Sequence, residues 1–514
     1  MVAAAHPLAV EAGVAVLERG GSALDAAIAA QMVLGLVEPQ SSGIGGGAFL
    51  LHWSQPEASL TSYDGRETAP AAARADRFLD AEAQPLGFFE AAVGGRSVGV
   101  PGLLRMLEAA HRRHGRRPWR ELFEPAIAAA EEGFALSARL HAQLEAEPFL
   151  AADPRARELY FTQQGRAKAP GTRIVNREYA ATLRRVALEG AEAFYRGEIA
   201  AAIVHAVRSH PRPGDLAEPD LAAYRPLERA PLCGPYRRWR VCSMGPPSAG
   251  GVGVLQILGL LERVPFDHAP AHSAVAVHLF SEAGRLAYAD RARHLADPDA
   301  IAVPLGRLLD PAYLDARART IGERSMREAP PGLFEPAGTT HLSVVDAQGN
   351  VAAMTSTIES IFGSRIMVRG FLLNNQLTDF DFAPGGPNEV APGKRPRSSM
   401  APTIVFDADG RVRLSLGSPG GPNIINYVAR ALVAVLDWGL DLPAAFAAPN
   451  FGSRNGPTLL EAATDYERLR APLEARGHVV ETVPLASGLH GIERVPGGWR
   501  GAADPRREGV ARGH

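Results

Sequence analysis

One junction in the 514-residue chain combines residues suited to self-cleavage and to nucleophilic attack. Gly338 precedes Thr339 and Thr340, where a Pro- and Gly-rich stretch meets an alternating, strand-like one. Glycine adopts strained backbone conformations at little cost. The Thr339 hydroxyl could therefore attack the Gly338 carbonyl, and water would then release a new N-terminus. The freed amine, with an intrinsic pKa of about 7.7–8.0, could act as base for the same hydroxyl. The alternative is two threonines at an ordinary strand start.

A second candidate is the glycine pair Gly420 and Gly421, between a predicted strand and a predicted helix. Two successive glycine N–H groups at a helix N-terminus can point toward an oxygen that develops negative charge. The pair would then form an oxyanion hole. The alternative is a simple turn that starts the helix.

Three further groups suit a small charged substrate. Arg66 is a natural bidentate partner for a carboxylate, although a surface ion pair is the default interpretation. Ser398 and Ser399 follow a basic stretch that could equally be a solvated loop. Gln376 and Asp379 come directly after a predicted strand, as a turn or as the rim of a pocket.

The composition is that of a globular protein, with 46% hydrophobic and 21% charged residues. Lys+Arg 54 against Asp+Glu 56 gives a net charge of −2, which excludes attraction of the whole molecule to nucleic acid or to an anionic membrane. Two cysteines exclude a disulfide scaffold and a Cys-based zinc site. We expect neither a metal nor a cofactor. The glycine run 43–47 follows a predicted helix and precedes a predicted strand, the reverse of a dinucleotide-binding fingerprint.

The elements that must position these residues form runs of helices and runs of strands, which favours α+β layers. A Pro- and Gly-rich linker is predicted at 325–338. Cys233 and Cys242 flank a predicted hairpin at 232–244; we expect packed free thiols, with a cross-strand disulfide as the alternative. Helices are predicted at 7–19, 22–37, 103–114, 119–132, 138–144, 177–188, 198–207, 250–261, 273–293 and 422–438, and strands at 48–53, 60–63, 340–346, 351–358, 371–374, 403–406 and 411–416.

No targeting signal is visible, since no basic start with an apolar run of the required length opens the chain. As written, the sequence is expected to be cytoplasmic. It would be periplasmic or secreted if an upstream segment is missing.

Taken together, these motifs resemble the gamma-glutamyltranspeptidase family of N-terminal-nucleophile hydrolases. The resemblance covers nearly the whole chain. It implies a four-layer αββα sandwich, made as one precursor and cut into a large subunit, 1–338, and a small subunit, 339–514, which together form one catalytic domain. The matching stretches are 3–8, 20–27, 43–47, 66–70, 289–291, 339–341, 373–376, 395–400, 417–421 and 503–506.

By this resemblance, cleavage falls between Gly338 and Thr339, and Thr339 is the nucleophile. Thr357 would support its activation, and Gly420 and Gly421 would form the oxyanion hole. A cationic clamp would hold the substrate α-carboxylate, opposite an anionic one that holds its α-ammonium. The cationic clamp comprises Arg66, Ser398 and Ser399; the anionic one comprises Gln376, Asp379 and Glu359, which stands where well-studied members carry Asn.

Several residues depart from the family pattern. Glu359 adds a negative charge, Arg397 replaces a usually apolar residue, and Arg365 lies in a usually Gly/Thr-rich segment. The stretch 381–393 is short, so we expect the lid loop of some members to be absent. His341, one place past Thr340, is interpreted as structural.

The resemblance implies hydrolysis or transfer of γ-glutamyl amides such as glutathione, with water or an amine as acceptor. A cephalosporin-acylase-like or oxamate-amidohydrolase-like amidase is the first alternative. A non-catalytic binding scaffold is the second, and the intact Thr339, Thr357, Gly420 and Gly421 argue against it. The partners would be a small molecule and the other subunit, with no nucleic acid and no membrane.

Overall fold

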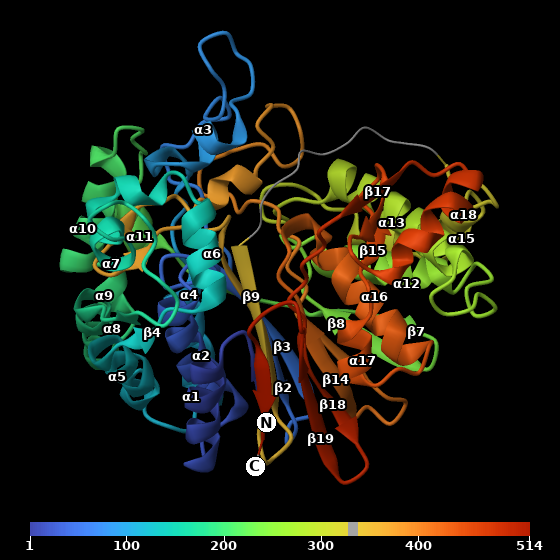
Figure 1. Ribbon diagram of the computed structural model, residues 1–514, viewed down its shortest axis with the longest axis horizontal. Helices are drawn as coiled ribbons and strands as arrows, with labels where there is room; N and C mark the ends of the chain where they lie inside the picture. The colour runs from blue at the N-terminus through green and yellow to red at the C-terminus, as the bar shows by residue number, and fades with distance from the viewer. Residues whose placement is uncertain (327–337, 514) are drawn as a thin grey trace.

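The computed structural model describes residues 1–326 and 338–513. Figure 1 shows four layers side by side, in the order helices, sheet, sheet, helices. The predicted αββα sandwich is confirmed. Each of these two sheets is antiparallel throughout, so the layers come from hairpins and returning strands rather than from βαβ units. None of the described helices is long and apolar enough to cross a membrane.

The first sheet has seven strands, and β9 and β10 pair near its centre. Their register places Thr357 opposite Thr339 and ends in an irregularity between Thr357 and Glu359. On its other edge, β10 pairs with β2, which places Gly47 opposite Thr357. The strands, in spatial order, are β20 (Val510–Arg512), β1 (Val2–Ala4), β9 (Gly338–Val345), β10 (Val351–Glu359), β2 (Gly47–Ser54), β3 (Ser59–Gly65) and β6 (Leu227–Arg229).

The second sheet has six strands and packs face to face with the first. Its central strand β14 ends at Gly417, just before the predicted oxyanion glycines. Ser415 of β14 is hydrogen-bonded to Ser343 of β9 across the two sheets (Oγ–Oγ 3.0 Å). In spatial order the strands are β19 (Gly498–Ala503), β18 (His490–Val495), β14 (Val412–Gly417), β13 (Thr403–Phe406), β8 (Trp239–Ser243) and β7 (Leu232–Tyr236).

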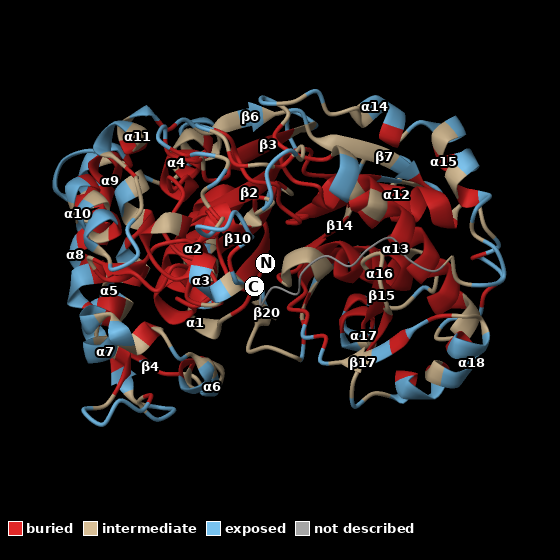
Figure 2. Cartoon of the chain, turned by 90° about the horizontal axis from the view of Figure 1, so that it is seen from above, coloured by how far each residue is buried: buried red, intermediate tan, exposed pale blue. Residues whose placement is uncertain are grey.

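The hydrophobic core has three layers, one in each gap of the sandwich. Alternation along β9 explains the division, because Leu342 and Val344 face the first helical layer while Val345 faces the second sheet. Figure 2 shows the consequence: the inner elements are buried, and the outer faces of the peripheral helices are exposed. The core between the sheets gives way to polar side chains near the Thr339 end of β9, where His341 and Thr339 share the face of Val345.

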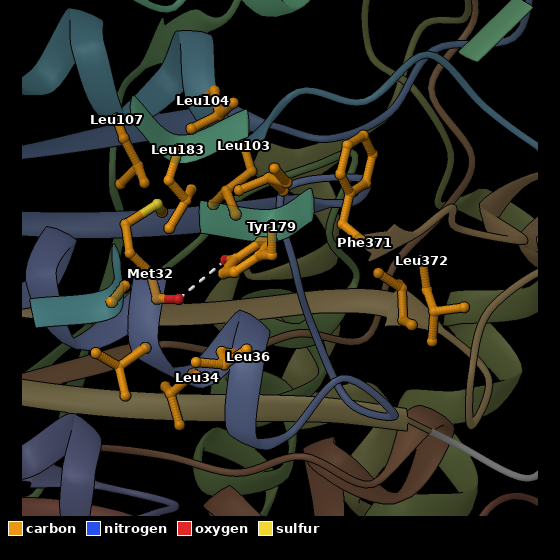
Figure 3. Close-up of a cluster of buried hydrophobic side chains, with 14 of the residues drawn as sticks. Met32, Leu34, Leu36, Leu103, Leu104, Leu107, Tyr179, Leu183, Phe371 and Leu372 are labelled. Carbon is orange, nitrogen blue, oxygen red and sulfur yellow. Dashed lines mark hydrogen bonds between the residues drawn. The ribbon is translucent and has the colours of Figure 1, made fainter. Parts of the chain in front are cut away.

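Helix α2 (Ala23–Val37) is buried along its whole length beneath the first sheet. Ser22 starts it with a capping box, in which the Ser22 hydroxyl accepts from the Asp25 amide (3.2 Å) and the Asp25 carboxylate accepts from the Ser22 amide (2.8 Å). Figure 3 shows Tyr179 donating to the Met32 carbonyl (2.9 Å) within this core. The layer also contains α1 (Pro7–Glu18), α4 (Leu103–His114), α5 (Glu124–Glu132), α6 (Ala138–Ala146), α7 (Pro154–Tyr160), α8 (Arg177–Glu189), α9 (Glu192–Tyr195), α10 (Gly197–Ser209) and α11 (Glu218–Ala223).

Helices α12 (Gly250–Leu261), α13 (Ala274–His294) and α16 (Ile424–Leu436) cover the second sheet. Smaller helices complete this side: α14 (Leu305–Leu308), α15 (Pro311–Ala318), α17 (Leu442–Ala447) and α18 (Arg470–Ala475). Strands β15 (Phe451–Ser453), β16 (Thr458–Glu461) and β17 (Val480–Val483) form a separate small sheet. Some short elements lie outside the main layers. They are the strand pair β4 (Phe134–Ala135) and β5 (Arg173–Ile174), the strand pair β11 (Met367–Val368) and β12 (Phe371–Leu372), and the helix α3 (Phe88–Ala92).

Cys233 and Cys242 form a disulfide, so the prediction of free thiols is wrong. The predicted hairpin is present as β7 and β8, and its register sets the two cysteines directly opposite each other, with Cα atoms 4.1 Å apart. Cross-strand neighbours point to the same face of a sheet, so two cysteines in that register meet. The sequence pattern predicts the hairpin but not its register.

The predicted linker 325–338 is described only at its ends, because 327–337 lie outside the described residues. Its last residue, Gly338, is not exposed linker: it is the buried first residue of β9 and pairs with Glu359. The bond predicted to be cut therefore lies at the end of a central strand.

Candidate active site

The two threonines Thr339 and Thr357 meet at the end of the central strand pair. Their Oγ1 atoms are 3.2 Å apart, and both residues are almost fully buried, with 4% and 2% of their surface exposed. The Thr357 hydroxyl donates to the Gly338 carbonyl (2.6 Å) and accepts from the Glu359 amide (2.8 Å). A carbonyl can only accept, so the Thr357 proton is committed to Gly338. The Thr339 hydroxyl is then the donor in its contact with Thr357.

Directed in this way, the hydrogen bonds form a short path from the Thr339 hydroxyl through Thr357 to the Gly338 carbonyl oxygen. The predicted nucleophile, its hydrogen-bond acceptor Thr357 and the carbonyl of the bond predicted to be cut are consecutive members of this path. Such an arrangement can move a proton while a new C–O bond forms, without a separate ionised base.

Arg66 is fully buried just after β3 and is held by backbone carbonyls. Its Nε donates to the Pro396 carbonyl (3.1 Å) and its Nη2 to the Arg397 carbonyl (2.9 Å). Nη2 also donates to the Asp379 carboxylate, which accepts from Gln376 Nε2 as well (2.8 Å). The predicted cationic and anionic clamps are therefore in direct contact rather than on opposite sides of the pocket.

Glu359 ends β10 with a positive φ of 81°. Its carboxylate accepts a hydrogen bond from Asn375 Nδ2 and one from the Thr378 hydroxyl (3.3 Å). The side chain is buried against the segment that carries Gln376 and Asp379. These contacts fix the additional negative charge in the pocket wall.

Ser398 and Ser399 are positioned by the loop between β8 and α12. The Ser398 amide donates to the Pro247 carbonyl (3.0 Å), and the Ser398 carbonyl accepts from the Ala249 amide (2.9 Å). Arg291, on α13, donates to the Ser399 hydroxyl (3.1 Å) and lines the same pocket. The sequence analysis gave Arg291 no role, because only its place in a matching motif distinguished it from the other arginines of that helix.

Gly420 and Gly421 form the turn between β14 and the 3-10 helix Gly421–Asn423 that leads into α16. Their φ values are 137° and 53°, which favour glycine. A Cβ atom on Gly420 would lie 2.5 Å from a ring carbon of Tyr427. Within the described parts of the chain, neither glycine amide has a hydrogen-bond acceptor, so both remain available as donors.

A single pocket unites the predicted site residues. Every one of them lines it except Gly338 and Gly420, which are the direct neighbours of lining residues. The lining residues are Arg66, Arg291, Thr339, Thr357, Glu359, Gln376, Asp379, Ser398, Ser399, Met400, Gly421, Pro422 and Ile424.

Burial governs the titration of the groups behind the pocket. It raises the pKa of Glu67 to about 8, although Arg66 Nη1 lies 3.9 Å from its carboxylate. It lowers the pKa of His341 well below the usual value. His341 is hydrogen-bonded to the Thr355 hydroxyl (2.8 Å) and the Ser343 hydroxyl (3.1 Å), as expected for a structural residue.

One group of possible metal ligands lies elsewhere, between α13 and the small sheet: His278, Glu282 and His478. His278 Nδ1 contacts His478 Nε2 (2.7 Å), and the other two ring nitrogens contact the Gly322 carbonyl (2.8 Å) and the Thr458 hydroxyl (2.7 Å). The guanidinium of Arg285 lies against Glu282 (2.9 Å). Nitrogens engaged in this way, beside an arginine, favour a neutral hydrogen-bonded pair over a bound cation.

The fold and the site together define the class. An αββα sandwich in which the second residue of a central strand is a threonine that lines a pocket is the architecture of an N-terminal-nucleophile hydrolase. The model of the gamma-glutamyltranspeptidase family matches residues 9–514, so the chain belongs to that family.

Individual relatives agree with this assignment. The glutathione hydrolase proenzyme of Bacillus subtilis (strain 168) is 35% identical, with 100% of this chain and 91% of the relative covered. The acylase ACY 1 proenzyme of Pseudomonas sp. (strain V22) is 36% identical, with 99% and 92% covered. Among solved structures, the cephalosporin acylase from Bacillus halodurans superposes with a TM-score of 0.87 at 28% identity, covering 100% of this chain and 96% of that one.

Proposed function

We propose that the chain is made as a proenzyme, cuts itself between Gly338 and Thr339, and then hydrolyses or transfers γ-glutamyl groups. The enzyme class follows from the family and from full-length relatives named glutathione hydrolase proenzymes. The observation that supports the residue roles is the directed contact of Thr339, Thr357 and the Gly338 carbonyl. The products are a large subunit, 1–338, and a small subunit, 339–514.

In self-cleavage, Thr339 Oγ1 attacks the Gly338 carbonyl carbon. Its proton passes to Thr357, which gives its own proton to the carbonyl oxygen. The tetrahedral intermediate then expels the Thr339 nitrogen, which takes up a proton and becomes an amine, and Gly338 is left as an ester on Thr339. Water hydrolyses this ester, releasing the Gly338 carboxylate and the free N-terminal threonine.

In turnover, the Thr339 amine takes the proton of the Thr339 hydroxyl as the oxygen attacks the substrate γ-carbonyl. The Gly420 and Gly421 amides donate to the oxyanion. The leaving amine receives the proton and departs, which leaves a γ-glutamyl ester. Water or an acceptor amine then attacks that ester and restores the enzyme.

Substrate recognition would use the contact between Arg66 and Asp379. An α-amino acid carries its carboxylate and ammonium on one carbon atom, so an adjacent cation and anion can bind both charges. Arg66, Ser398 and Ser399 would hold the carboxylate. Asp379, Gln376 and Glu359 would hold the ammonium.

The second candidate is an amidase with another acyl group. Two observations support this candidate: some relatives are named acylases, and Glu359 is fixed in the pocket wall. The two functions share the Thr339 chemistry and differ in the acyl group. Oxamate, glutaryl anilide and γ-glutamyl anilide therefore separate them.

The experiment is a comparison of kcat/KM for these three substrates. Hydrogen bonds to charged groups contribute about 1.5–3 kcal/mol, so we expect the γ-glutamyl anilide to exceed the glutaryl anilide by at least about tenfold. Asp379→Ala should narrow that ratio, mainly by slowing the γ-glutamyl substrate. Thr339→Ala is the blank. A wild type that prefers glutaryl anilide or oxamate would transfer the assignment to the amidase.

A further inference from the structure

The chemistry of the free Thr339 amine raises a problem of charge. An N-terminal amine has a pKa of about 7.7–8.0 in the absence of neighbours, and only its unprotonated form can accept the hydroxyl proton. The pocket in front of Thr339 contains the carboxylates Glu359 and Asp379, which favour the protonated form. The cations Arg66 and Arg291 offset them there, and Arg66 is already in contact with Asp379.

A further cation reaches Thr339 from behind the pocket. Strand β1 pairs with β9 only at Val344 and Ser343, so the edge of β9 beside Thr339 has no neighbouring strand. The C-terminal segment covers this edge instead. Arg507 Nη1 donates to the carbonyl of Thr339 itself (3.3 Å), and Nε donates to the Ser487 carbonyl (3.0 Å).

The position of Arg507 is fixed, and among the described residues its charge has no salt-bridge partner. Gly488 packs so closely that a Cβ atom there would lie 2.6 Å from Arg507 Nε. Within residues 1–326 and 338–513, no carboxylate oxygen lies within salt-bridge distance of Arg507. Burial and Arg139 lower the pKa of Arg507 to about 10, so it remains a cation at neutral pH.

The other titratable groups near this edge are either hydrogen-bonded to or paired with groups other than Thr339, or neutral. Glu38 lies 3.5 Å from Arg139, and Glu508 accepts from the Arg139 amide (3.1 Å). Asp504 is paired with Arg506 (3.1 Å). His341 and His490 are buried, with pKa values below the usual one, and are neutral at neutral pH. Of these charged groups in the described part of the chain, Arg507 is the one hydrogen-bonded to Thr339.

We propose that Arg507 is a positioning residue that keeps the amine of Thr339 unprotonated in the cut enzyme. The inference rests on the proposed function, because the amine exists only after cleavage at Thr339. Within one residue the amide nitrogen and the carbonyl oxygen are about 3 Å apart, so the guanidinium lies within about 6–7 Å of the amine. A like charge at that range disfavours protonation.

The test is the acidic limb of the pH profile of kcat/KM for γ-glutamyl anilide. In Arg507→Met the acidic limb should move to higher pH by about half a unit or more. Arg507→Lys keeps the charge, so its limb should lie close to that of the wild type. Arg507→Gln keeps a donor for the Thr339 carbonyl without the charge, and should behave like Arg507→Met. Arg512→Met, five positions away in an exposed ion pair with Glu11, is the matched control.

Glu67 titrates in the same range and must be separated from the amine. Each variant is therefore also measured in a Glu67→Gln background, where the shift caused by Arg507 should persist. An unmoved limb in Arg507→Met and Arg507→Gln would overturn the inference, as would a Gln variant that behaves like wild type. Self-cleavage involves no free amine, so failure of the Met and Gln variants to cut would also contradict it. A wild type that lacks Thr339 at a new N-terminus would instead contradict the proposed function.

Discussion

At the scale of single residues, the proposed function gives Thr339 two tasks that share one hydroxyl. We expect Thr339→Ala to remain a single uncut chain without activity, because both self-cleavage and turnover begin with attack by Oγ1. Thr339→Ser should still cut, more slowly. A denaturing gel with N-terminal sequencing of the smaller product measures both. A cut Thr339→Ala protein would end the hypothesis.

The glycine pair offers a second residue-scale prediction. Gly420 has a φ of 137°, and the Tyr427 ring fills the space where a side chain would go. Gly420→Val should therefore displace the amide donors and lower kcat by roughly 10²-fold, as the loss of one oxyanion donor typically does. Burst-phase kinetics with γ-glutamyl anilide would locate the loss in ester formation. A variant with unchanged kcat would place the oxyanion hole elsewhere.

At the scale of elements, the hairpin of β7 and β8 includes the disulfide that the sequence analysis did not favour. Its closed loop is short, since the cysteines are 9 positions apart. The chain-entropy model gives about 2–3 kcal/mol for a loop of this size. We expect Cys233→Ala with Cys242→Ala to lower the free energy of unfolding by that amount, measured in the uncut Thr339→Ala background. Thiol titration of the unreduced, denatured wild type should find no free thiol.

The helices and strands also show which structural features can be predicted from sequence patterns. Long helices and alternating strands were predicted closely, because a 3.6-residue or two-residue period over many positions has few structural solutions. Pairings between distant segments were not predicted. The register of a pairing decides which two side chains come into contact. Cys233 and Cys242 form a disulfide because of the register of one hairpin, and Arg66 and Asp379 are in contact because two distant segments pack together. The predicted site residues could be named from local motifs, whereas the contacts of Arg291 with Ser399 and of Arg507 with Thr339 come from tertiary packing that no local pattern contains.

At the scale of the whole molecule, buried Glu67 should make stability depend on pH. Its folded pKa of about 8 is above its unfolded value, so between about pH 4.5 and 8 the folded state holds a proton that the unfolded state has lost. The contribution of this group to the free energy of unfolding therefore falls as pH rises through that range. Above about pH 8 this contribution no longer changes with pH. In the Thr339→Ala background, we expect the Tm of Glu67→Gln minus the Tm of its parent to increase from pH 5 to pH 8. A difference in Tm that does not change with pH would show that Glu67 ionises normally.

The proposed cut between Gly338 and Thr339 would divide each sheet between two subunits: β9, β10 and β20 would come from the small subunit in the first sheet, and β13, β14, β18 and β19 in the second. Neither product of the cut retains a whole sheet, so the two cannot separate without exposing both cores. Dilution alone should therefore not dissociate the mature enzyme, and its lifetime should be set by the unfolding barrier. Before the proposed cut, the peptide bond gives the two segments a high effective concentration during folding, and the cut would remove that advantage. Once denatured, the mature enzyme must reassemble from two chains, while the uncut Thr339→Ala protein can refold as one.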